Sequence, residues 1–107
     1  MELLTVKELH LFRKFGCQEW KPLKEVKVIA KYFHPYSSRT RYATEFDAKT
    51  GLFFGLVDGI AVEWGSFSLQ EFKQLIRWIP FERDRYFEVC TAEEVLNRIS
   101  KERGGFM

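Results

Sequence analysis

The sequence predicts an α+β domain: a four-stranded, mainly antiparallel meander sheet with about three helices on its core face. Three observations predict this class. Apolar residues alternate with other residues around two turns within residues 42–69, as in half-buried strands. Three capping boxes mark helix starts outside the strands. The 107 residues are 46% hydrophobic and 17% aromatic, enough for one globular domain spanning 1–107 to bury its own core.

Helix starts are predicted where a Ser or Thr is followed three residues later by Glu, because the two side chains satisfy backbone N–H groups reciprocally. These boxes begin at Thr5, Ser68 and Thr91. A glycine or proline then ends each helix. The expected end signals are Gly16, Pro80 and the Gly104–Gly105 pair.

Strands are expected at 25–33 and in the central meander, and residues 81–87 are expected to form an extended segment or a short edge strand. Asp58-Gly59 between apolar runs predicts a two-residue hairpin loop. That loop would pair Phe53 with Trp64 and Phe54 with Glu63. The longer turn at 47–51 predicts the pairs Phe46–Phe53, Glu45–Phe54 and Ala43–Leu56.

This register predicts one core face, with Trp64 buried beside Phe53, and one outer face. The core face is expected to contain Tyr42, Thr44, Phe46, Phe53, Gly55, Val57, Ile60, Val62 and Trp64. The outer face is expected to contain Arg41, Ala43, Glu45, Leu52, Phe54, Leu56, Ala61 and Glu63. The outer face mixes charged with large apolar residues, so it is either a solvated surface with scattered hydrophobic residues or a binding surface.

The candidate binding residues lie on that outer face and in the loop before it. We hypothesise that Arg41, Glu45 and Glu63 form one polar site beside Phe54, since a guanidinium has the donor fork to hold a carboxylate across neighbouring strands. The full candidate set is Arg41, Glu45, Phe54, Glu63, Arg39 and Tyr36.

No catalytic residue, metal site or cofactor is predicted. The sequence has no Walker glycine loop, no G-x-G-x-x-G and no G-x-S-x-G elbow, and its Cys and His residues lack zinc-ligand spacing. Whether it is an enzyme stays open, with a non-enzyme favoured. The N-terminal residues do not resemble a signal peptide and no apolar run has membrane-spanning length, so we expect a cytoplasmic protein with reduced cysteines and no membrane partner.

Charge is unevenly distributed although the net charge is only +2. Residues 1–41 contain nine Lys or Arg and four Asp or Glu, whereas residues 42–72 contain one and five. Basic and aromatic side chains alternate around 27–41, which is compatible with nucleic-acid binding. The pI of about 8.6 is below the strongly basic footprint of most such domains, and lysines also protect edge strands from aggregation.

Several motifs resemble those of a family of small bacterial proteins known only as a domain of unknown function and common on plasmids, integrative conjugative elements and phages. The matching segments are Leu3-Leu4-Thr5, Gln18-Glu19, YATEFD at 42–47, FFGLV at 53–57, EWGSFSLQE at 63–71 and ERDRYF at 82–87. The resemblance implies a mobile-element context and no particular activity. It adds interest to the polar run Glu82, Arg83 and Asp84, in which Arg83 could instead bridge a carboxylate and brace the sheet.

Three functions follow as hypotheses, in order of preference. The first is a non-enzymatic protein-binding module of a mobile genetic element, with a host or element-encoded protein, such as a defence component, as its partner. The alternative is a nucleic-acid-binding accessory factor. The third is a small metal-dependent hydrolase or nuclease that uses the carboxylates. The sequence leaves the partner's identity and the oligomeric state open.

Overall fold

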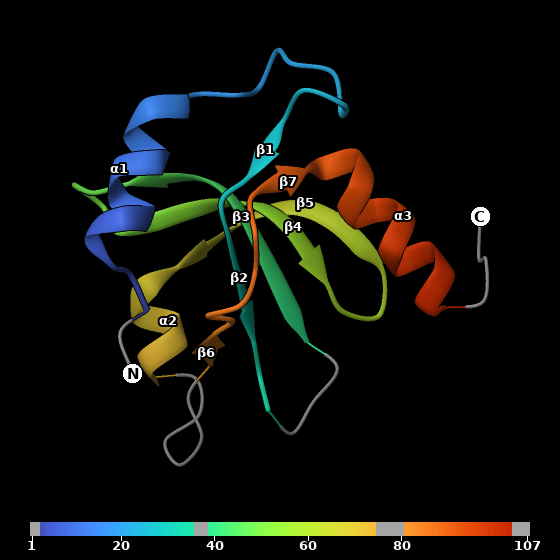
Figure 1. Cartoon of the computed structure of the whole chain (residues 1–107). Helices are drawn as coiled ribbons and strands as arrows, with labels where there is room; N and C mark the ends of the chain where they lie inside the picture. The colour runs from blue at the N-terminus through green and yellow to red at the C-terminus, as the bar shows by residue number, and fades with distance from the viewer. Residues whose placement is uncertain (1–2, 36–38, 75–80, 104–107) are drawn as a thin grey trace.

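The computed structural model describes residues 3–35, 39–74 and 81–103 and has an α+β fold (Figure 1). Within these ranges a five-stranded antiparallel sheet has the order β5-β4-β3-β2-β6, and β1 and β7 form a two-stranded antiparallel sheet. The elements in chain order are α1 (Val6–Phe15), β1 (Lys27–Val28), β2 (Ala30–Phe33), β3 (Thr40–Asp47), β4 (Leu52–Asp58), β5 (Val62–Ser68), α2 (Leu69–Gln74), β6 (Glu82–Arg83), β7 (Cys90–Thr91) and α3 (Ala92–Glu102). No helix in the described ranges has the length and apolar character needed to cross a bilayer.

The α+β class and the antiparallel sheet are confirmed, whereas the prediction of four strands is wrong in detail. The expected strand over 25–33 divides at Ile29 into β1 and β2, which belong to different sheets. The division occurs because Val28 packs in one core cluster and Ala30 in another. The ambiguous segment after residue 80 supplies β6, the short edge strand, and β7 was not anticipated.

The predicted capping box at Thr5 and the N-cap at Thr91 are observed directly. Thr5 N–H donates to Glu8 Oε1 at 2.8 Å, and Glu94 N–H donates to Thr91 Oγ1 at 3.1 Å. α1 ends at Gly16, whose φ of 56° is the left-handed conformation that glycine tolerates best. α2 begins directly after Ser68, as predicted. The expected ends at Pro80 and at the Gly104–Gly105 pair lie outside the described residues.

Both faces of the sheet are covered, so the prediction of a single core face is wrong. α1 and α2 pack on one face, and α3 with the two-stranded sheet packs on the other (Figure 1). The first cluster comprises Phe12, Ile29, Ala30, Tyr32, Ala43, Phe53, Phe67, Phe72 and Phe81. The second comprises Val26, Val28, Tyr42, Leu56, Cys90, Ala92, Val95 and Ile99. A sheet buried on both faces has large apolar residues on both. This explains why the side chains of Phe54 and Leu56 point to the face opposite that of Phe53.

A β-bulge at Thr44 changes the faces of β3. The predicted pairs Phe46–Phe53 and Glu45–Phe54 are confirmed. The register then shifts between Ala43 and Glu45, so Ala43 pairs with Gly55 rather than with Leu56. Because a bulge adds one residue to one strand, side chains before it exchange faces relative to an unbulged pairing. Ala43 therefore belongs to the first cluster, on the side of α1, and Tyr42 to the second cluster, on the side of α3. The prediction had these two residues on the opposite faces.

The hairpin from β4 to β5 has a three-residue loop instead of the predicted two-residue loop. Asp58 pairs with Val62, and Phe53 pairs with Phe67 rather than with Trp64. The shift of three positions is odd, so every β5 side chain is on the face opposite to the predicted one. Trp64 is 42% exposed and Ile60 is fully exposed; the expectation that they belong to the core is wrong.

The reason for this register lies in tertiary contacts. Phe67 fills the core position beside Phe53, with stacked rings 5.4 Å apart. Asp58 is buried and accepts a hydrogen bond from Arg103, which also donates to Gly59 O. Burial raises the pKa of the Asp58 carboxyl, and the Arg103 guanidinium opposes this shift by stabilising the charged form. Asp58 is therefore fixed as a strand residue and is not part of the loop.

Gly55 is the position where β3 and β4 approach too closely for any side chain. A Cβ placed there would clash with the carbonyl oxygen of Tyr42. We predict that Gly55→Ala lowers the free energy of unfolding by at least about 1–3 kcal/mol, the usual cost of overpacking, because backbone atoms must move. Urea denaturation measures the change.

Gly65→Ala is the matched control on the neighbouring strand. Its added Cβ would lie 3.6 Å from Val57 Cγ2, an ordinary contact. Since Ala restricts the unfolded chain, this variant should be as stable as the wild type or up to about 1 kcal/mol more stable. Equal destabilisation by the two substitutions would contradict the observed register.

Candidate functional site

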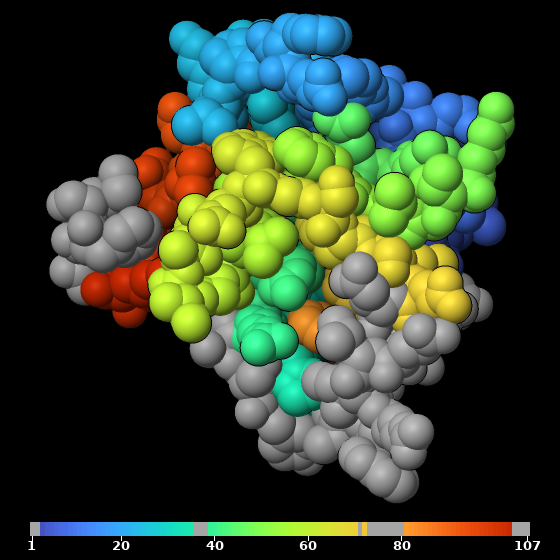
Figure 2. Space-filling model, turned by 180° about the vertical axis from the view of Figure 1, so that it is seen from behind, coloured from blue at the N-terminus to red at the C-terminus, as the bar shows by residue number. Residues whose placement is uncertain are grey.

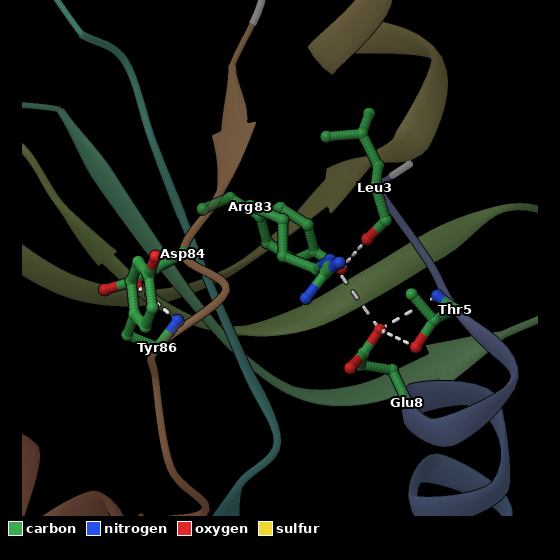
Figure 3. Close-up of polar contacts among 7 residues, drawn as sticks. Leu3, Thr5, Glu8, Arg83, Asp84 and Tyr86 are labelled. Carbon is green, nitrogen blue, oxygen red and sulfur yellow. Dashed lines mark hydrogen bonds and ion pairs between the residues drawn. The ribbon is translucent and has the colours of Figure 1, made fainter. Parts of the chain in front are cut away.

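A polar cluster joins the start of α1 to the edge strand β6 (Figure 3). Arg83 Nε lies 3.7 Å from Glu8 Oε1, and the two side chains are only 13% and 10% exposed. Beside them, the buried Tyr32 hydroxyl donates to the carbonyl oxygen of Leu3 at 2.7 Å. Burial raises the pKa of Tyr32 above its ordinary value, and the negative charge of Glu8 adds to the effect. Tyr32 therefore remains a neutral hydrogen-bond donor.

This cluster accounts structurally for the Glu82-Arg83-Asp84 run. Arg83 forms an ion pair with the carboxylate of Glu8, in agreement with the alternative in which Arg83 braces the sheet. Asp84 accepts a hydrogen bond from Tyr86 N–H at 2.9 Å and lies 3.9 Å from Lys31 Nζ (Figure 3 shows the first contact). Glu82 pairs with Phe33 across the strands. The run thus holds the β6 edge against α1 and β2.

The predicted polar site of Arg41, Glu45 and Glu63 is not formed. Arg41 and Glu63 both lie opposite Val57, whereas Glu45 lies opposite Phe54 on the other face of the sheet. The Thr44 bulge and the three-residue loop cause this separation. The Arg41 guanidinium carbon lies 5.6 Å from the centre of the Phe81 ring instead. Arg39 is exposed, and Tyr36 lies outside the described residues.

Gln18 organises the region that the sequence prediction missed. Its side chain is 2% exposed and fits between β1 and the bulge. Nε2 donates to Lys27 O at 2.9 Å and to Thr44 O at 2.8 Å, and Oε1 accepts from Lys27 N–H at 2.7 Å. Gln18 N–H donates to Glu45 Oε2 at 3.1 Å. The available signal was the Gln18-Glu19 motif, whose function could not be inferred without the fold.

Because Gln18 fixes the connector between α1 and β1, that connector overhangs the α3-side face of the sheet. The result is a cavity of about 320 Å³, here named the aromatic pocket. Its lining residues are Gln18, Glu19, Lys21, Leu23, Val26, Thr44, Glu45, Phe54 and Trp64. Two of the predicted site residues, Glu45 and Phe54, are therefore brought together here.

Phe54 and Trp64 form the aromatic part of this pocket. Their rings are parallel within 10°, with centroids 5.8 Å apart. Trp64 keeps 42% of its surface exposed although it stacks on Phe54, and Leu23 is 41% exposed. The pocket thus combines an accessible apolar surface with two carboxylates, Glu19 and Glu45, and one lysine, Lys21. The excess negative charge suits an apolar group that carries or adjoins a positive charge.

Metal-binding chemistry has no candidate group in the described part of the chain, where no three His, Cys, Asp or Glu side chains gather as potential ligands. His34 directly follows β2 and is buried, with 8% of its surface exposed. Its ring lies 5.6 Å from that of Phe81, so it contributes to the α1-side core.

Gln18→Glu tests whether the connector depends on this amide. The substitution keeps the side chain's size but places a carboxylate oxygen against the carbonyls of Lys27 and Thr44 and beside Glu45. We expect the free energy of unfolding to fall by about 2 kcal/mol or more, since buried donors and acceptors lose their partners and like charges meet. Chemical denaturation followed by tryptophan fluorescence measures this change.

Glu19→Gln at the adjacent exposed position serves as the control and should stay within about 0.5 kcal/mol of the wild type. If Gln18→Glu behaved like this control, the connector would be held by other contacts.

Comparison with known proteins identifies the family. The family described as "Protein of unknown function (DUF2958)" matches residues 3–106, and the chain belongs to it. No curated protein and no solved structure matches the chain.

Proposed function

We propose that this member of the DUF2958 family is a non-enzymatic protein-binding module and that the aromatic pocket is its contact surface. The observation that carries this proposal is the stacked Phe54–Trp64 pair, accessible at the surface of a sheet that has a buried core cluster on each face. Tryptophan dominates binding hot spots because one rigid side chain buries a large area on association. An exposed Trp held rigid by stacking is preorganised for such a contact.

The biological setting is part of the same proposal. The motif resemblance supports a mobile genetic element as the genomic context. A cytoplasmic location and a host or element-encoded protein partner, such as a defence component, complete the proposal. The aromatic pocket is of a size that fits one large side chain of such a partner, because its volume is about 320 Å³.

The arrangement of charges favours a protein partner over nucleic acid. Tyr32 is fully buried, Lys31 lies near Asp84, and Arg41 lies over Phe81, so these members of the basic and aromatic stretch already have contacts within the chain. At the aromatic pocket, the two carboxylates of Glu19 and Glu45 outnumber the one ammonium group of Lys21, so the pocket's net charge disfavours a phosphate backbone. No specific observation favours the hydrolase or nuclease alternative.

Trp64→Ala is expected to abolish partner binding with little effect on folding, because Trp64 is a partly exposed surface residue. Affinity enrichment from host lysate with quantitative mass spectrometry should identify a protein retained by the wild type and lost by the variant. Titration of that purified protein should then show a loss of affinity of about 30-fold or more, as for a hot-spot residue.

Trp20→Ala is the matched control, since Trp20 is 83% exposed in the same connector and does not line the pocket. It should bind as the wild type does. Equal retention by the Trp64 variant would refute the assignment of the pocket. The nucleic-acid alternative would be favoured if the protein bound duplex or single-stranded DNA with an affinity that falls steeply with salt and is unchanged by Trp64→Ala.

A further inference from the structure

The two edges of the five-stranded sheet differ in how they are protected. β6, at one edge, is only two residues long and both are charged. β5, at the other edge, runs for seven residues, and β4 is its one hydrogen-bonded neighbour among the described strands. Proteins usually protect long edges with lysine, proline or bulges. β5 contains neither lysine nor proline, and Glu63 is its one charged residue.

The unprotected edge and the aromatic pocket belong to the same strand. Trp64 lines the pocket from β5, and Ile60, in the loop that leads into β5, is fully exposed. Figure 2 shows the yellow residues of β5 across the surface that is hidden in Figure 1. Main-chain hydrogen-bonding groups and a large apolar anchor are thus presented side by side, the combination used when a peptide extends a sheet by one strand.

We propose that the partner binds by adding an extended basic segment to β5 as a further strand. This inference rests on the proposed function, because the segment would insert an apolar side chain against Trp64. Neighbouring residues of a strand point to opposite faces, so Glu63 and Trp64 face different sides of the sheet. The segment should therefore carry a Lys or Arg opposite Glu63 and, at the adjacent position, a large apolar residue opposite Trp64.

Charge supports a basic segment over a second copy of this chain. Residues 50–72 contain no Lys or Arg but contain Asp58, Glu63 and Glu71. Asp58 is engaged by Arg103, whereas Glu63 is exposed on the edge strand. Two copies joined through β5 would bring no basic residue of that strand to Glu63. In the register that places the two Glu63 side chains opposite each other, the like charges would be unfavourable. A basic partner segment provides the missing charge.

Selection of a random nine-residue peptide library against the full chain provides the probe. The selected peptides should contain a Lys or Arg next to a large apolar residue. Hydrogen exchange followed by NMR should show that the best peptide protects alternate amides of β5 at least tenfold. Failure to select any such peptide would overturn the inference, as would a dimer of the free chain in which the same amides are already protected.

Backbone N-methylation of the selected peptide separates strand addition from simple pocket filling. Methylation removes one N–H and leaves every side chain unchanged, and alternate N–H groups of an added strand point toward its neighbour. One alternate set of methylated positions should therefore lose at least tenfold in affinity, while the other set should lose less than twofold. Uniform tolerance, with Trp64→Ala still blocking the peptide, would overturn strand addition but preserve the pocket as the contact surface.

A charge exchange tests the basic residue. Glu63→Lys should weaken the basic peptide at least fivefold, and a peptide with its Lys replaced by Glu should recover the loss on this variant. Unchanged affinity on Glu63→Lys would overturn the predicted pairing. If Trp64→Ala also left binding unchanged, the proposed function itself would fail for this surface.

Discussion

The architecture depends on the β-bulge at Thr44 and on the buried amide of Gln18 that satisfies it. A bulge leaves a backbone carbonyl outside the ladder, and here Thr44 O accepts from Gln18 Nε2 while Thr44 Oγ1 donates to Phe54 O. The same amide bonds to both backbone groups of Lys27 and so positions β1. One side chain therefore joins the connector, the small sheet and the large sheet. Because each of these buried groups would be costly to leave unpaired, they are fixed together.

The bulge also determines how the sheet is buried. It directs Ala43 toward α1 and Tyr42 toward α3, so both faces of β3 acquire apolar residues suited to helices on both sides. Phe12, Phe46 and Phe53 pack as adjacent rings on the first face. On the second face, Leu56 packs near Val95 and Ile99 of α3. The region of this second face near Phe54 is covered only by the connector, which is why a pocket exists there.

Features encoded locally could be predicted from the sequence, and those fixed by distant contacts could not. The helix starts at Thr5 and Thr91 and the Phe46–Phe53 register follow from residues a few positions apart. The second hairpin was mispredicted because Arg103, 45 residues away from Asp58, holds that residue in the strand and overrides its turn propensity. This one error changed the predicted position of every β5 side chain, because an odd register shift moves each side chain to the other face of the sheet. Trp64 and Glu63 were both assigned to the wrong face for this reason. Within the candidate site, Glu45 and Phe54 could therefore be anticipated, whereas Trp64 and Gln18 could not.

The contact between Asp58 and Arg103 connects the core of the molecule to the proposed binding edge. Arg103 follows α3, whose Val95 and Ile99 are fully buried against the sheet, and it holds both Asp58 and the carbonyl of Gly59 at the tip of the hairpin. β5 begins at Val62, three residues after Gly59, and has no partner strand on its outer side among the described residues. Because β4 is the one hydrogen-bonded neighbour of β5 among the described strands, the Arg103 contacts at the hairpin tip add to the interactions that fix its register. The edge that lacks protection against added strands is thus anchored at its N-terminal end by Arg103. An edge ordered before binding loses less entropy when a partner segment pairs with it.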